Sequence, residues 1–119
     1  MNRPIKFRAE YEGKIYTVAS IDFSNELGIQ VGLLAPSGNI LVVHIDNVKL
    51  MQFTGLTDKN GKEIYEGDIV RYRDGIYKVD WFENGFYLFR DVRAKFDIWW
   101  VDTEVIGNIY ENPDLLTNL

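Results

Sequence analysis

Few side chains in this 119-residue sequence could carry acid/base or nucleophilic chemistry. His44 is the one histidine, it lies among Val42, Val43 and Ile45, and the sequence has no cysteine. Nucleophilic catalysis needs a nucleophile, a base and a group that orients the base, and no motif here supplies that set. Carboxylate pairs could exchange protons, and two are Glu63 with Glu66 and Asp97 with Asp102. Such pairs are more often solvated strand ends, so we expect no enzyme, no catalytic residue and an ordinary strand position for His44.

A second candidate for chemistry is the segment Asp58-Lys59-Asn60-Gly61, which is similar to part of a calcium-binding loop. Aligning Gly61 with the glycine of that loop puts Leu56 at the first ligand position and Gly67 at the twelfth. Neither residue has a side-chain oxygen. We therefore expect a plain turn there, with no metal site and no cofactor.

A basic strip is the best local case for binding nucleic acid, because cations beside aromatic rings can neutralise phosphates and stack bases. Asp80 and Asp91 interrupt the strip, and the formal net charge of −5 opposes nonspecific binding. Trp99 stands on an otherwise polar strand face and could instead anchor a protein partner. The predicted interaction face consists of Arg71, Arg73, Lys78, Arg90 and Trp99.

The segment Met51–Val70 organises the elements that would position these residues. Asn60-Gly61 stands between two apolar runs, and both residues tolerate positive φ, which predicts a two-residue hairpin turn. Glu66-Gly67-Asp68 predicts a second reversal. Ile69-Val70 then begins a strand of β-branched residues.

Two hairpins are predicted before this segment, because apolar-rich runs flank turn residues. The first pairs residues 5–9 with residues 14–18 around Glu12-Gly13. The second pairs residues 30–35 with residues 39–45 around Pro36-Ser37-Gly38. Between the hairpins, Asp22–Leu27 is compatible with one helical turn or with a loop.

A meander of strands is predicted after Val70. Asp74-Gly75 favours a two-residue turn that pairs Tyr72 with Tyr77. A two-residue loop at Asn84-Gly85 would put Arg90 on the core face, so a three-residue loop over residues 83–85 is preferred. The core face in that register carries Val70, Tyr72, Tyr77, Val79, Trp81, Tyr87 and Phe89.

Three more elements are predicted towards the C-terminus. Residues 92–101 alternate as a strand with Trp100 facing the core, and residues 104–110 form a last short strand. Asn112-Pro113 predicts a cap and the first position of a helical turn over residues 114–117. Bulky apolar residues on both faces of these strands need covering, either by the N-terminal hairpins or by another subunit. We favour a symmetric homo-oligomer.

Composition places the chain among proteins with one sizeable core, since 119 residues suit one domain and aromatic residues make up 14%. No apolar run approaches the roughly 18 residues of a spanning helix, and the N-terminus lacks the apolar core of a signal peptide. The absence of cysteine is compatible with the cytosol. We expect a cytoplasmic protein without a membrane partner.

Three blocks of the sequence resemble the YopX-like family, which consists of small proteins carried by bacteriophages and prophages. The blocks are residues 3–9 (RPIKFRA), residues 52–70 without Thr57 (QFTGL and DKNGKEIYEGDIV) and residues 105–113 (VIGNIYENP). They frame the whole chain, and the central block is the specific one. Glu10 departs from the family pattern, which often has an aromatic residue there.

The resemblance implies a mostly β fold within a single domain, residues 1–119. Residues 1–50 would form a small N-terminal β-hairpin region and residues 51–119 an SH3-like barrel region. It implies no activity and no catalytic residues. We expect a phage or prophage protein of the bacterial cytoplasm that acts as a non-enzymatic protein-interaction module. Expected partners are a second copy and an unidentified host or phage protein, and the alternative is a weak nucleic-acid-binding module that uses the basic face.

Overall fold

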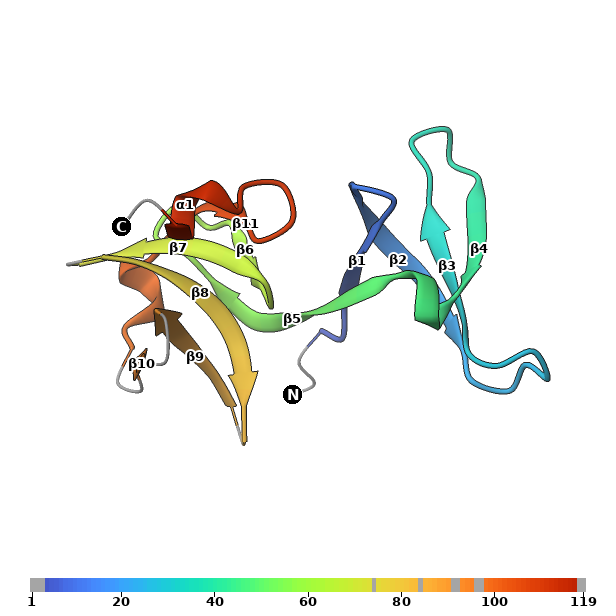
Figure 1. The fold of residues 1–119 in the computed structure, drawn as a ribbon, viewed down its shortest axis with the longest axis horizontal. Coiled ribbons are helices and arrows are strands. Elements are labelled where there is room, and N and C mark those ends of the chain that lie inside the picture. Colours follow the sequence, from blue (N-terminus) through green and yellow to red (C-terminus); the bar gives the residue numbers. More distant parts are fainter. Residues whose placement is uncertain (1–3, 74, 84, 91–92, 96–97, 118–119) are drawn as a thin grey trace. The chain divides into compact units, whose positions relative to one another are not determined.

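The computed structural model is built almost entirely of β-strands (Figure 1). It describes residues 4–73, 75–83, 85–90, 93–95 and 98–117. Residues Lys6–Gln52 form one compact unit, and the chain from Phe53 onwards forms a second. Strand β5 (Lys49–Thr57) runs from the first unit into the second. The predicted mostly β fold is confirmed.

The N-terminal unit is an antiparallel sheet in the order β4-β3-β2-β1-β5. Its other strands are β1 (Phe7–Tyr11), β2 (Lys14–Asp22), β3 (Gln30–Leu34) and β4 (Ile40–His44). Both predicted hairpins are confirmed, and Glu12 and Gly13 join the first one with φ of 50° and 84°. The core of the sheet consists of Ala9, Val31, Leu33, Val43 and Val48.

The segment between β2 and β3 is a loop rather than a helical turn. Asp22 Oδ1 accepts hydrogen bonds from the Ser24 amide at 2.9 Å and from the Ser24 hydroxyl at 2.8 Å. Asn25 Oδ1 accepts from the Leu27 amide at 2.8 Å. Short polar side chains thus pair with nearby backbone and replace the bonds that a helix would make.

The C-terminal unit contains a sheet in the order β10-β9-β8-β7-β11, and β6 pairs with the second half of β5. These elements are β6 (Glu63–Tyr65), β7 (Asp68–Tyr72), β8 (Gly75–Phe82), β9 (Gly85–Arg90), β10 (Arg93–Lys95), β11 (Glu104–Asn108) and helix α1 (Asp114–Thr117). The reversal at Gly67, the last strand and the C-terminal helical turn are confirmed. Within the described residues the sheet has β10 and β11 at its ends and does not close on itself, so the SH3-like barrel stays a prediction.

The turn between β5 and β6 differs from its prediction. The Gly61 amide donates to the Asp58 carbonyl at 3.0 Å, and the Asp58 amide donates to the Lys62 carbonyl at 2.8 Å. The loop therefore has three residues, and Gly61, but not Asn60, has positive φ, at 80°. The two-residue turn was wrong because Asp58 begins the turn, and aspartate at the first position with glycine at the fourth is typical of type I.

The predicted register is wrong by two residues between β7 and β8 and by one residue between β8 and β9. Tyr72 pairs with Gly75 rather than with Tyr77, and Trp81 pairs with Phe86 rather than with Tyr87. Asp74 and Asn84 lie outside the described residues. Gly75 begins β8 at a crowded position: an added Cβ would lie 3.1 Å from Arg90 Nη1 and 3.2 Å from Tyr77 Oη, so these side chains would have to shift slightly for a larger residue.

The corrected register changes which side chains of β9 face the core. Leu88 is completely buried opposite Val79, and Phe86 packs against the same cluster. Tyr87 and Phe89 face the other side, where the Phe82 ring meets them edge-on with centroids 6.5 and 6.1 Å away. Because side chains alternate along a strand, a shift of one residue moved this whole set. The core consists of Ile64, Val70, Tyr72, Tyr77, Val79 and Leu88.

The predicted strand over residues 92–101 is interrupted. Trp100 begins a short 3₁₀ helix, η2 (Trp100–Asp102), instead of continuing the alternation. Ile98 and Trp100 nevertheless pack against the core as expected. Residues 92, 96 and 97 lie outside the described residues.

Candidate functional site

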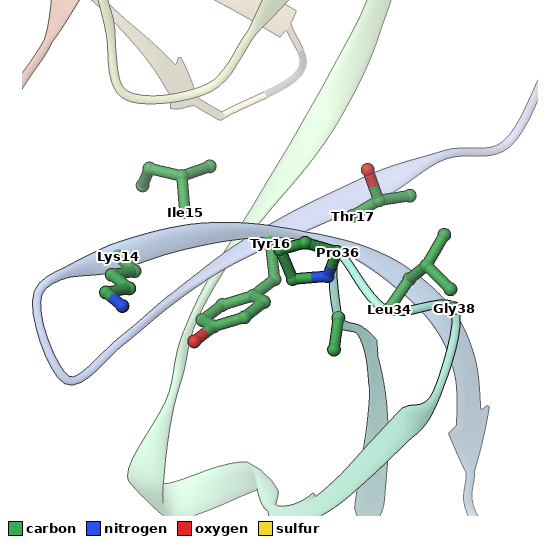
Figure 2. A pocket seen from close by; sticks show the side chains of 8 residues that line it. Lys14, Ile15, Tyr16, Thr17, Leu34, Pro36 and Gly38 are labelled. Atoms are coloured by element: carbon green, nitrogen blue, oxygen red, sulfur yellow. The ribbon is translucent and has the colours of Figure 1, made fainter.

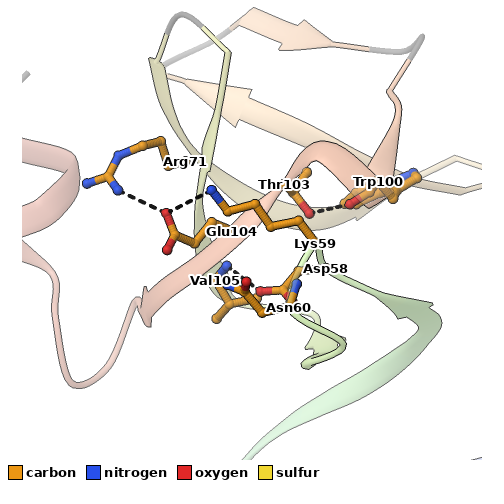
Figure 3. Close-up of polar contacts among 8 residues, drawn as sticks. All are labelled: Asp58, Lys59, Asn60, Arg71, Trp100, Thr103, Glu104 and Val105. Carbon is orange, nitrogen blue, oxygen red and sulfur yellow. Dashed lines mark hydrogen bonds and ion pairs between the residues drawn. The ribbon is translucent and has the colours of Figure 1, made fainter.

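Asp58 is a buried acidic side chain of the central block, and it is 5% exposed. Its Oδ1 accepts hydrogen bonds from the amides of Asn60 at 2.8 Å and Lys62 at 2.9 Å. Its Oδ2 accepts from the amide of Val105 at 2.9 Å. Figure 3 shows the carboxylate between its own turn and Val105, which belongs to β11. One side chain therefore fastens the β5–β6 hairpin to the last strand.

These contacts also set the charge state of Asp58. Burial by itself would raise the pKa of the carboxyl, because it penalises the ionised form. The backbone N–H groups of Val105, Lys62 and Asn60 oppose that effect, and the result is a pKa below the ordinary value of 3.8. Asp58 is thus a permanently ionised structural group at neutral pH, with its lone pairs directed at backbone donors.

Other buried polar residues of the family-like blocks are also bonded to the backbone. The Thr54 hydroxyl donates to the Ile64 carbonyl at 2.8 Å, and Asp68 Oδ2 accepts from the Tyr65 amide at 2.8 Å. Asn108 Oδ1 accepts from the two amides of the turn that follows it, at 3.0 and 2.9 Å. Buried polar groups need such partners, so these residues support the fold and leave no free reactive group.

The other candidates for catalysis are not assembled into a site. His44 caps η1 (Ile45–Asn47), where its Nδ1 accepts from the Asp46 amide at 3.0 Å. Asp102 forms an ion pair with Arg73, and Asp97 lies outside the described residues. Within the part of the chain that the structure describes, no three His, Asp or Glu side chains gather as a metal site would require.

A cavity of about 470 Å³ opens on the N-terminal unit, between the start of β2 and the turn after β3 (Figure 2). The Tyr16 ring and Pro36 line it, together with Thr17 and Leu34. Lys14 contributes the one ionisable amine, and the lining contains neither a carboxylate nor an imidazole. The cavity therefore offers apolar contact and hydrogen bonding but no acid/base pair.

The predicted basic strip is divided by the structure. Arg71 and Lys59 both approach Glu104 Oε1, at 3.0 and 3.7 Å (Figure 3), and Arg73 approaches Asp102 at 3.6 Å. Lys78 lies 3.3 Å from Asp80. Each of these cations therefore has a carboxylate neighbour, which reduces the positive potential that a phosphate would meet.

Arg90 is separated from the other basic residues. Arg90 lies on the same face of the sheet as Phe86 and Leu88, and its guanidinium lies near Tyr77, a core residue. Arg71 and Lys78 instead lie on the same face as Phe89, which pairs directly with Lys78. This face of β7–β9 thus combines two of the predicted cations with the exposed Phe82 ring and the half-buried Tyr87 and Phe89 rings.

The backbone of Trp99 is held by two hydrogen bonds, although the residue is 65% exposed. Its amide donates to the Tyr72 hydroxyl at 3.0 Å, and its carbonyl accepts from the Asp102 amide at 2.9 Å. Thr103, completely buried, bonds its hydroxyl to the Trp100 carbonyl at 2.6 Å. The fixed backbone presents Trp99 and Val101 outward while Trp100 packs inward.

Three blocks of the sequence resemble the YopX-like family, and the sequence profile of the YopX protein family matches residues 6–117. The chain belongs to the YopX protein family. The crystal structure of protein EF1440 from Enterococcus faecalis is similar to it, with a TM-score of 0.67 and 25% identity over 97% of this chain and 99% of that chain. No curated protein matches the chain.

Two surfaces of this YopX family member were not predicted from the sequence. The Phe82, Tyr87 and Phe89 face was missed because the turn glycines suggested a different register. The exposure of β4 was not predicted, because its run of Ile, Leu and Val indicated a strand but not which face of the strand is covered. Among the described residues no helix has the length and apolar character to cross a bilayer.

Proposed function

We propose that this YopX family member is a non-enzymatic protein-interaction module of a phage or prophage, acting in the cytoplasm of a bacterial host. The observation that carries the proposal is the exposed Trp99, whose backbone is held by two hydrogen bonds, beside the exposed Val101. A tryptophan side chain has only two torsions to restrict on binding, and tryptophan is enriched among residues that dominate interface energies. The partner is an unidentified host or phage protein, or a second copy of the chain.

The proposal assigns no enzymatic role, because three side chains that could act as acids or bases are already hydrogen-bonded to the backbone. His44 caps a 3₁₀ turn, and Asp58 and Asp68 accept bonds from backbone amides. A general base must reach a substrate proton, and these groups are already directed elsewhere.

Trp99→Ser should abolish capture of the partner without lowering stability, because the Trp99 side chain makes no cap bond to η2 and serine is a good capping residue. The wild type, Trp99→Ser and Ile5→Ser would be immobilised and exposed to lysates of phage-infected and uninfected bacteria. Quantitative mass spectrometry should find a protein that the wild type and Ile5→Ser enrich and that Trp99→Ser does not. Ile5→Ser is the matched control, because it removes another exposed apolar side chain. An unchanged set of proteins on Trp99→Ser would contradict the proposal.

Weak binding of single-stranded nucleic acid is the second candidate, and the aromatic face of β8 and β9 favours it. Phe82, Tyr87 and Phe89 share that face with Lys78 and Arg71, so bases could stack on rings beside two cations. The ion pairs of Arg71 and Lys78 and the net charge of −5 place it second.

Arg71→Glu combined with Arg73→Glu should abolish any such binding, since both cations become anions. Fluorescence anisotropy of short labelled oligonucleotides at low salt would measure it, and wild-type affinity should fall steeply as salt rises. Lys14→Glu with Lys49→Glu changes the net charge equally but leaves this face intact, and should retain most of the affinity. No detectable wild-type binding to single- or double-stranded DNA or RNA would eliminate the candidate.

A further inference from the structure

Strand β4 is the free edge of the N-terminal sheet, where the strand order ends. It pairs with β3 over all five residues without a bulge. The Ala35 amide donates to the Asn39 carbonyl at 2.8 Å, and the alternation from that pair directs the backbone groups of Ile40, Val42 and His44 away from β3. His44 also caps η1, so its carbonyl belongs to that turn. The edge therefore offers the amides and carbonyls of Ile40 and Val42 and the amide of His44.

The side chains of β4 lack the features that usually prevent edge strands from pairing. Natural edges carry lysine, proline or a bulge, whereas β4 reads Ile-Leu-Val-Val-His with no charge and no proline. Ile40, Leu41 and Val42 are 47%, 42% and 61% exposed, and Leu34 of β3 lies exposed next to Ile40. An exposed apolar edge of this kind favours the addition of another strand.

The charge of the N-terminal unit indicates what kind of partner pairs with the β4 edge. The unit 6–52 contains four Lys or Arg residues against five Asp or Glu residues, so it is close to neutral, and β4 itself has no charged side chain to attract a nucleic acid or a highly charged peptide. A neutral, apolar strand is the complementary partner. A second β4 has that chemistry and matches in length.

We propose that two copies of the chain pair through antiparallel β4 strands about a twofold axis at Val42. Val42 then lies opposite Val42 of the second copy, Leu41 opposite Val43, and Ile40 opposite His44. The amide and carbonyl of Val42 pair with those of the second Val42, the His44 amide meets the Ile40 carbonyl, and no like charges face each other. An isologous contact of this kind closes after two subunits. The inference goes beyond the proposed function, because it uses the N-terminal unit and not Trp99.

Cross-linking tests the geometry directly, because the chain has no cysteine of its own. In Val42→Cys the two thiols lie opposite each other, so a short bis-maleimide should convert most of the protein into covalent dimers. Leu27→Cys places the thiol on an exposed position of the loop before β3 and should give few. Equal cross-linking of the two variants, or none in Val42→Cys, would overturn the proposal.

Sedimentation of the wild type should show a dimer at micromolar concentration. Val42→Lys places two ammonium groups opposite each other and should weaken dimerisation about tenfold or more. Leu27→Lys, with the same charge change, should leave the dimer intact. Circular dichroism will show that Val42→Lys is folded, as its exposure predicts. A monomeric wild type, or a dimer that Val42→Lys does not weaken, would refute the β4 interface, whereas lysate capture through Trp99 tests the proposed function separately.

Discussion

Asp58→Ala should lower the free energy of unfolding by about 3 kcal/mol or more, since a buried donor that loses its partner costs about 1 to 3 kcal/mol. The substitution removes the acceptor of three backbone amides, those of Asn60, Lys62 and Val105. The first two belong to a turn with exposed residues, where water can replace the carboxylate in part. Val105 is half-buried, so its amide would be the costliest of the three to leave unpaired. The bond from the Lys59 amide to the Thr103 carbonyl would remain, so we expect the attachment of β11 to the β5–β6 hairpin to be weakened. Urea unfolding monitored by tryptophan fluorescence would measure the loss.

Asp58→Asn is the matched control. The amide oxygen of asparagine can still accept from the turn, but its NH₂ group would face the Val105 amide, so its cost should lie between that of the wild type and that of alanine. A urea midpoint of Asp58→Ala equal to that of the wild type would show that the carboxylate does not hold these elements together.

The contribution of Asp58 should depend on pH in a defined direction. Its pKa is lower in the folded chain than the ordinary 3.8, so the folded state favours the ionised carboxylate. The stabilisation is fully present above pH 3.8 and is lost as the pH falls through the lower pKa of the folded state. The difference in stability between wild type and Asp58→Asn should therefore be constant near neutrality and shrink in acid. A difference that grew as the pH fell below 3.8 would contradict the assignment.

Leu88→Ala should lower the free energy of unfolding by about 3 kcal/mol, within the range found for buried leucines, because it leaves a cavity that its neighbours fill only in part. Leu88 is fully buried and lies opposite Val79 in the C-terminal core. The same urea titration applies. Thermal unfolding should show a matching decrease in Tm.

Phe89→Ala is the control that tests the register of β9. Phe89 faces the other side of the sheet, opposite Lys78, and its ring touches Phe82 at the protein surface. Its loss should cost about 1 kcal/mol, the typical value of an aromatic pair. The register expected from the sequence buried Phe89 instead. A larger loss for Phe89→Ala than for Leu88→Ala would therefore reinstate that register.

Local chemistry in the sequence was sufficient for most strands and several turns of this protein. Glu12-Gly13 and Pro36-Ser37-Gly38 gave the two N-terminal hairpins, since the conformations these turns need are available to few other residues. Asn112-Pro113 indicated α1 because proline at the first helical position needs no amide partner. The three blocks indicated the YopX family. The lack of a catalytic set in sequence also suggested that the polar residues of the central block are structural.

Tertiary structure alone decided the registers and therefore the surfaces. Gly75 and Gly85 follow residues that favour a turn, yet both begin strands, and Arg73 and Glu83 take the positive φ instead, at 46° and 56°. Residues other than glycine accept that strain when packing compensates for it, and the burial of Leu88 against Val79 does so here. Because the side-chain period of a strand is two, the one-residue shift between β8 and β9 put Leu88 in the core and moved the Tyr87 and Phe89 rings to the face of Phe82, which no local pattern specifies.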